Sequence, residues 1–312
     1  MDHILYKKRF ILFIILIFFI INNTSIGKLV TIDNQKSLNY ERNIFYVGGQ
    51  NPGNFSNIQE AIDQASTGDT IYVYNGTYIQ NIFINFTLNL IGEDKNTTFI
   101  DGGSQNDVIY IGFPADAVTI TGFTIQNSGN NSEGGAIFDA GLEIHSDYNN
   151  IINNIIKQHP LYGIVLWASK GDNISYNKIT NCERSGIYFL AGPSNTISHN
   201  IISSNEVGIS SLGSTNCKEN FISHNTFINN NKGLAMCGSN NQIFNNNFIN
   251  NIDFNAMSHF DFLKFKPSRN TWYQNYWDKW IGFGPKWVPG FLGFNFDWYP
   301  AHQPYPYQEG EK

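Results

Sequence analysis

Isoleucine and asparagine recur at fixed distances through the middle of the chain. Five segments follow the pattern Asn/Asp-x-Ile-x-x-Asn-x-Ile/Phe, and they cover residues 149–156, 172–179, 195–202, 220–227 and 241–248. Their central asparagines are separated by 23, 23, 25 and 21 residues, and are Asn154, Asn177, Asn200, Asn225 and Asn246. A unit of this length has room for strands and turns but not for a crossover helix.

A second apolar element recurs inside each unit. It begins with glycine, and its copies start at Gly163, Gly186, Gly208 and Gly233. Alternating inward residues in short strands, stacked unit upon unit, build a core of aliphatic columns in which Ile174 lies on Ile151. The sequence therefore predicts an all-β fold, a single-stranded right-handed parallel β-helix (solenoid), with coils of about 23 residues.

The conserved spacing also suggests roles for the recurring polar residues. Asparagine tolerates the left-handed backbone conformation, and its amide can hydrogen-bond the same amide one coil away. We therefore expect the asparagine column to form left-handed turn positions with a structural role. Glycine at the second turn is expected for the same steric reason.

Both ends of such a stack need a cap. Ser56 to Gln59 has the pattern of a capping box, and Ile58, Ala61 and Ile62 form the apolar stripe of one short helix, which predicts an N-terminal capping helix. From residue 271 onward the repeat is replaced by aromatic, glycine and proline residues. This segment predicts an irregular aromatic C-terminal cap.

The N-terminus has the features of a secretory signal peptide. Lys7, Lys8 and Arg9 precede an apolar run from Phe10 to Ile21, and cleavage is expected after Gly27. An uncleaved membrane anchor is the alternative. The predicted organisation is a signal peptide over residues 1–27, a linker over 28–43, the β-helix over 44–270 and the cap over 271–312. The main body is expected to be secreted, periplasmic or on the cell surface.

Charge and cysteine content narrow the range of partners. The net charge is −6, with 19 Lys and Arg against 25 Asp and Glu, so the chain has no basic field for a nucleic acid. Its three cysteines cannot form a complete disulfide framework. One bridge, between Cys217 and Cys237, is a possibility because both precede the first isoleucine of the next repeat by five or six residues.

With these columns laid out, the chain resembles the pectin-lyase-like β-helix proteins, and among them the NosD-type proteins of the carbohydrate-binding and sugar-hydrolase group. The resemblance covers about 260 residues. It rests on the segments 57–63, 68–71 and 75–78, on the repeats, and on 275–278 with 296–300. It implies a polysaccharide or cell-surface glycan as partner, and for the NosD type it implies copper.

No acidic residue recurs on the outward positions of the repeats, which are Val165, Tyr188, Ser210 and Ala235 on one strand. The most acidic stretch is the insertion before Asn154. There Asp139, Glu143 and Asp147, with His145 among them, are candidates for acid–base catalysis or a calcium site, and a solvated loop is the alternative.

Two further candidate sites come from the repeats and the cap. His199 and His224 occupy the same position one coil apart and are candidates for a shared transition metal such as copper, although stacked surface histidines are the alternative. Trp280 and Trp287 are the candidates for an exposed carbohydrate platform, because tryptophan faces stack on sugar rings.

These patterns predict an extracellular or cell-envelope protein that binds or scaffolds polysaccharide without catalysis. A carbohydrate-active enzyme, a polysaccharide lyase or glycoside hydrolase, is the first alternative. A periplasmic copper-binding accessory protein is the second.

Overall fold

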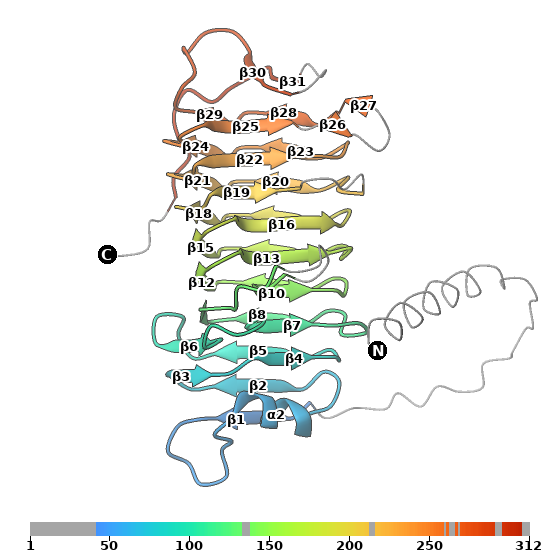
Figure 1. Ribbon diagram of the computed structural model, residues 1–312, viewed down its shortest axis with the longest axis vertical. Helices are drawn as coiled ribbons and strands as arrows, with labels where there is room; N and C mark the ends of the chain where they lie inside the picture. Colours follow the sequence, from blue (N-terminus) through green and yellow to red (C-terminus); the bar gives the residue numbers. More distant parts are fainter. Residues whose placement is uncertain are drawn as a thin grey trace, which may run out of the picture. The chain divides into compact units, whose positions relative to one another are not determined.

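The computed structural model describes residues 42–132, 138–211, 216–258, 260–261, 266–267, 269–290 and 295–307. The predicted signal peptide and most of the predicted linker lie outside these residues. Strands of three parallel sheets follow one another in each coil, and the coils stack into a right-handed β-helix (Figure 1). Within the described residues, no helix has the length and apolar character that crossing a membrane requires. The predicted fold class is confirmed.

Each sheet takes one strand from each coil. The twelve-stranded sheet contains β1 (Ile44–Val47), β2 (Thr70–Val73), β5 (Asn89–Gly92), β8 (Thr119–Thr121), β11 (Asn150–Ile152), β14 (Asn173–Ser175), β17 (Thr196–Ser198), β20 (Phe221–Ser223), β23 (Gln242–Phe244), β28 (Thr271–Tyr273), β31 (Asn295–Asp297) and β30 (Lys286–Val288). The nine-stranded sheet contains β3 (Gly76–Ile79), β6 (Thr98–Asp101), β9 (Thr124–Gln126), β12 (Ile155–His159), β15 (Lys178–Cys182), β18 (Ile201–Ser203), β21 (Thr226–Ile228), β24 (Asn247–Ile249) and β29 (Tyr276–Trp277).

The third sheet has eight strands and carries the candidate site described below. It contains β4 (Ile82–Ile84), β7 (Ile109–Ile111), β10 (Ala140–Ile144), β13 (Tyr162–Trp167), β16 (Ser185–Ala191), β19 (Val207–Ser210), β22 (Lys232–Met236) and β25 (Phe254–Ser258). A separate antiparallel pair joins β26 (Phe260–Asp261) and β27 (Lys266–Pro267).

The core consists of the predicted aliphatic columns. Ile120, Ile151, Ile174 and Ile197 pair strand to strand in register, and all four are fully buried. Near the C-terminal end aromatic rings replace isoleucine: Phe227 stacks on Phe248 at 4.9 Å between ring centroids. The core is thus continuous through the coils, because identical positions return to the same angle in each lap.

The asparagine column is a buried ladder of hydrogen bonds. Asn177 donates from its backbone N–H and from Nδ2 to Oδ1 of Asn200, at 2.9 and 3.1 Å, and Nδ2 also donates to the Ile151 carbonyl at 2.7 Å. Amide stacking between coils is therefore confirmed. The expected backbone conformation is wrong, because the left-handed position is the residue before each ladder asparagine, such as His199 with φ 57°.

The ladder ends on a carboxylate. Asp297, fully buried in β31, accepts through Oδ2 from the backbone N–H of Asn275 at 2.8 Å, from its Nδ2 at 3.0 Å and from Trp277 Nε1 at 3.1 Å. Through Oδ1 it accepts from the backbone N–H groups of Gln274 and Tyr299. The last position of the column receives hydrogen bonds and has no further coil to donate to, so an acceptor-only group fits it.

A second ladder contains an acid in the place of an amide. Asn149 donates from N and Nδ2 to Oδ1 of Asp172, and the Asp172 N–H donates to Oδ1 of Asn195. The other oxygen, Oδ2, is buried and has no hydrogen-bond partner among the described residues. Burial, with the like charge of Asp147 as a smaller cause, raises the pKa of Asp172 to about 7.

The glycines at the second position of β13, β16 and β19 serve close packing instead of a left-handed turn. A Cβ on Gly163 would lie 2.6 Å from the Gly186 carbonyl oxygen, and a Cβ on Gly186 would lie 2.8 Å from the Gly208 oxygen. Neither glycine has a positive φ. The predicted steric reason is therefore wrong, since it is the backbone of the next coil that excludes a side chain.

The N-terminal cap is the predicted helix, α2 (Ile58–Gln64), with a different N-cap residue. Asn57 takes that role, and its side chain accepts from the Glu60 N–H at 3.2 Å. The predicted box between Ser56 and Gln59 does not form, because the Gln59 amide donates to Asp63 and to the Phe83 carbonyl. Ile58, Ala61 and Ile62 are buried on the first coils, as predicted.

The three cysteines are buried thiols, so no disulfide forms. Cys237 donates its N–H to Oγ of Ser211 in the preceding coil, while Cys217 lies against Gly238. The suggested register of Cys217 with Cys237 is therefore wrong by one position.

Candidate functional site

The strand β10 brings an acid and a histidine to the outer face of the eight-stranded sheet. Its residues Leu142 and Ile144 point into the core, so Glu143 and His145 face outward. In register, Glu143 lies between Tyr110 of β7 and Val165 of β13. The strand is the first after the insertion between β9 and β10, and that insertion contributes to the same surface.

Two further carboxyl groups join Glu143. Asp107, two residues before β7, accepts from the Ala140 N–H at 2.7 Å, and Asp139 at the end of the insertion accepts from the Asn131 N–H at 2.7 Å. Asp139 and Glu143 are 7% and 5% exposed. Three acids thus converge beneath the outer surface, supplied by two coils and an insertion.

Asp107 holds its proton at neutral pH. Burial is the main cause, the neighbouring negative charge of Glu143 the second, and together with a side-chain hydrogen bond to Glu143 they raise the pKa of Asp107 to about 8. Two carboxyl groups in contact cannot both ionise without a large electrostatic cost. Asp107 is therefore an acid beside Glu143 around pH 7.

His145 connects this pair to a row of aromatic rings. Its Nε2 lies 2.5 Å from Oε1 of Glu143. Its ring is stacked on Trp167 of β13, with centroids 5.0 Å apart and planes 14° apart, and it contacts Tyr110 at 4.9 Å. Tyr110 in turn stacks on Phe83 of β4 at 5.6 Å. We call Phe83, Tyr110, His145 and Trp167 the aromatic row; it crosses four coils along the helix axis.

An apolar cluster borders the acids on the other side. Phe138 packs edge-on against Tyr162 and Tyr188, whose rings stack at 4.8 Å, and the Arg184 guanidinium lies over the Tyr162 ring at 5.9 Å. Tyr188 occupies the same outward column as Glu143 and Val165. This outward column has no acid within the repeats. In the coils before Val165 it contains Phe83, Tyr110 and then Glu143.

The predicted acidic residues divide between two places. Asp139 and Glu143 both lie near Asp107. Asp147 lies in the turn after β10, where its Oδ1 accepts from the Lys170 N–H at 2.9 Å. Sequence reasoning missed Asp107, which is 32 residues before Asp139 and outside any repeat motif. The available signal was its position two residues before the strand that pairs with β10.

The predicted histidine pair is in contact, with a parallel geometry. His199 and His224 stack at 4.9 Å with planes 2° apart, and Tyr176 continues the stack at 4.8 Å. Burial, with His199 as the second cause, lowers the pKa of His224. The described residues contain no group of three or more His, Cys, Asp or Glu side chains suited to a metal ion. A copper site at this pair stays a prediction.

The two predicted tryptophans differ in exposure and in surroundings. Trp287 of β30 is 53% exposed, whereas Trp280 packs partly against the core and lines a pocket that Trp287 does not. A carbohydrate platform on these two residues stays a prediction.

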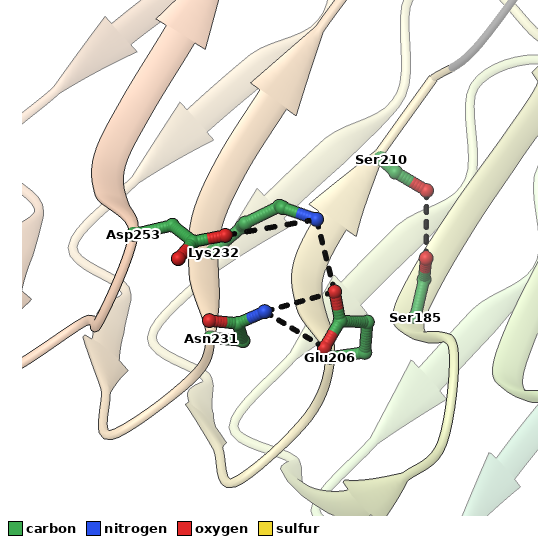
Figure 2. A network of polar contacts seen from close by, with 6 residues as sticks. All are labelled: Ser185, Glu206, Ser210, Asn231, Lys232 and Asp253. Atoms are coloured by element: carbon green, nitrogen blue, oxygen red, sulfur yellow. Dashed lines mark hydrogen bonds and ion pairs between the residues drawn. The ribbon is translucent and has the colours of Figure 1, made fainter.

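A polar network lies where the strands β19, β22 and β25 begin (Figure 2). Lys232 contacts Glu206 at 2.9 Å and Asp253 at 3.9 Å, and Asn231 Nδ2 donates to both Glu206 oxygens. The hydrogen bond from Lys232 is the main cause that lowers the pKa of Glu206. Beside it runs a groove of about 720 Å³ that His159, Asn181, Glu183 and Asn205 also line. Since the charges are paired and partly exposed, we assign them a minor structural role.

Solved structures with the same fold include pectin methylesterases. A pectin methylesterase mutant in complex with a hexasaccharide has a TM-score of 0.57 and 14% identity, with 80% of this chain and 92% of that chain covered. The enzyme PemA from Erwinia chrysanthemi has a TM-score of 0.51 and 13% identity, with 81% and 93% covered. At this identity the likeness concerns the fold alone. No curated protein matches the sequence.

The family comparison agrees with the stacked coils. The family model of a right-handed β-helix region matches residues 95–252, just over half of the chain. This protein belongs to the right-handed β-helix family.

Proposed function

We propose that this protein binds a polysaccharide on the outer face of the eight-stranded sheet, along the aromatic row and the adjoining acids. The observation that carries the proposal is the row itself, in which four rings from four coils follow one another beside three carboxyl groups. Aromatic rings provide apolar faces and edges for sugar rings, and carboxyl groups accept hydrogen bonds from hydroxyls. The pectin methylesterases of the same fold, one of them in complex with a hexasaccharide, support this class of ligand.

The charge of the site favours a neutral glycan over a polyuronate. Asp139 and Glu143 add acidic groups to a surface where Asp107 keeps its proton near pH 7, and Arg184, which lies over Tyr162, is the cationic side chain of the neighbouring cluster. A polyanion would meet like charge on a chain whose net charge is −6. Location outside the cytoplasm is part of the proposal and rests on the apolar segment from Phe10 to Ile21.

Replacing Trp167 with alanine is expected to weaken glycan binding by about tenfold, which corresponds to the loss of roughly 1.4 kcal/mol of contact energy. The affected contact is the face of the row next to His145. Binding is measured on a glycan array and then by calorimetry with the best neutral oligosaccharide. The matched control is Tyr148→Ala, which removes a 52% exposed ring outside the row. Equal loss in both variants would contradict the proposal.

Hydrolysis of an ester substituent is the second candidate function, and the protonated Asp107 beside Glu143 favours it. An acid in contact with an ionised partner can give and take a proton. Glu143 lies close enough to Asp107 to raise the pKa of that carboxyl group, whereas the two carboxyl groups of glycosidases stand about 5 Å or more apart. The geometry therefore favours acyl chemistry over cleavage of a glycosidic bond.

The variant Asp107→Asn separates the two candidate functions. Its amide oxygen can still accept from the Ala140 N–H, so the fold and glycan binding are expected to persist while ester release falls by about 100-fold, the scale of one lost acid–base group. In the wild type, release is expected to decline as the pH rises through about 8, because Asp107 then loses its proton. Acetate and methanol release from esterified polysaccharides is measured. Unchanged turnover in the variant would exclude this chemistry.

The NosD-type resemblance supports a third proposal, a copper-binding accessory role that uses His199 and His224. Its test is copper titration of the wild type against a variant with both histidines replaced by alanine. Equal copper uptake by the two proteins would exclude the site.

A further inference from the structure

A second hollow lies at the C-terminal cap, away from the acids. It has a volume of about 660 Å³ and opens between the turn after β28, the loop over residues 280–285 and the segment over residues 298–305. Its lining residues are Gln274, Trp280, Phe283, Trp298, Tyr299, Tyr305, His302, Ala301, Gly282, Gly284, Pro285 and Pro300. The volume falls in the range typical of small-ligand sites.

Exposed aromatic side chains line this pocket. Phe283, Trp298 and Tyr299 are 81%, 63% and 67% exposed. Other cap rings did enter the core, since Trp272 and Trp277 are 3% and 2% exposed. Large exposed apolar surface that gathers around a hollow is typical of a binding site.

The floor of the pocket is held in place before any ligand arrives. The segment that carries Tyr305 is fastened to β24: the Tyr305 N–H donates to Oδ1 of Asn247 at 2.8 Å, and Nδ2 of Asn247 donates back to its carbonyl at 2.9 Å. The Tyr305 hydroxyl donates to the Gln274 carbonyl at 2.7 Å. Such a fixed floor lowers the ordering cost of binding.

The polar side chains that line the pocket include one titratable base, His302. None of its described lining residues is Asp, Glu, Lys or Arg. Trp280, whose ring packs against His302 at 5.2 Å, has a buried Nε1–H with no hydrogen-bond partner among the described residues. A buried donor without an acceptor costs free energy.

We propose that this pocket is a separate binding site for a neutral sugar chain, formed by Trp280, Phe283, Trp298 and Tyr299 with Gln274 and Tyr305. Sugar rings combine an apolar C–H face with a hydroxyl rim, which matches aromatic walls over a polar, uncharged floor. The pocket lining offers no carboxylate, ammonium or guanidinium group to a charged ligand, and an acyl chain would bury the polar floor without compensation. The site uses Trp280 as the sequence suggested, but with Trp298 in place of Trp287.

The test uses the full-length protein and calorimetry with cellohexaose, xylohexaose and mannohexaose, with hexagalacturonate as the anionic probe. Trp298→Ala is expected to raise the Kd for the best neutral probe by at least about tenfold. Trp287→Ala is the matched control, because it removes an equally exposed tryptophan of the same cap outside the pocket. Phe283→Ala repeats the test from the other wall.

The result that would overturn the inference is an equal loss in Trp298→Ala and Trp287→Ala, or tighter binding of hexagalacturonate than of every neutral probe. Absence of saturable binding to all three neutral probes would overturn it as well. Trp167→Ala distinguishes this site from the aromatic row: if only Trp167→Ala weakens binding, the cap site fails and the proposed function stands. If only Trp298→Ala weakens binding, the cap site stands and the proposed site on the aromatic row fails.

Discussion

Replacing Asp172 with asparagine is expected to stabilise the protein by about 4 kcal/mol above pH 7, since a pKa raised from 3.8 to about 7 corresponds to roughly 1.4 kcal/mol per pH unit. The side chain is 1% exposed, so solvent does not screen this cost. Asparagine keeps the oxygen that accepts from Asn149, and its amide supplies donors where Oδ2 has no partner.

The raised pKa of Asp172 determines how the free energy of unfolding changes with pH. Because the folded state holds the Asp172 proton more tightly than the unfolded chain, the wild type keeps its full stability below about pH 4 and loses it as the pH rises through 7. The gain of Asp172→Asn therefore vanishes below pH 4. Urea unfolding at pH 4, 6 and 8 measures it.

The matched control introduces an acid at the next position of the same column, whereas Asp172→Asn removes one. Asn195 occupies the next rung, and its Nδ2 donates to the Ser169 carbonyl at 3.2 Å. Asn195→Asp is expected to destabilise the protein at pH 8 and to do so less at pH 4. If Asp172→Asn leaves the unfolding midpoint unchanged at pH 8, Asp172 is not a buried acid in the ladder.

Removing the end of the principal ladder is expected to be the most damaging single change. Asp297→Ala should destabilise the protein by about 3–5 kcal/mol, because it leaves buried donors without an acceptor. The donors are the backbone N–H and Nδ2 of Asn275, Nε1 of Trp277, and the backbone N–H groups of Gln274 and Tyr299. Urea unfolding at pH 7 measures the loss.

A second aspartate provides the control for Asp297. The Asp253 side chain is 51% exposed, and its contact with Lys232 is 3.9 Å long (Figure 2), so Asp253→Ala is expected to change stability by less than about 0.5 kcal/mol. Since Asp297 also holds the Tyr299 backbone, Asp297→Ala should weaken binding in the cap pocket. A cost for Asp297→Ala no larger than that for Asp253→Ala would mean that the ladder needs no terminal acceptor.

The candidate site was only partly accessible to sequence reasoning. Asp139 and Glu143 were found because they are acidic residues in an insertion. Asp107 was missed because its closeness to Glu143 depends on the register in which β7 pairs with β10. The insertion between β9 and β10 interrupts the repeat, so this register cannot be counted from the sequence. The exposed aromatic wall at Trp298 and Tyr299 was missed for a related reason: composition shows that a cap is aromatic but not which rings are buried.

The sequence by itself determined the fold, because a side-chain pattern that repeats every 21 to 25 residues allows only coils of strands whose like residues stack. It also determined the capping helix and the aromatic end. The tertiary structure alone decided which residue of each turn is left-handed, why glycine is the second residue of several strands of the third sheet, and which acids and rings share a surface. These features depend on the distance between neighbouring coils, and no local pattern along the chain records it.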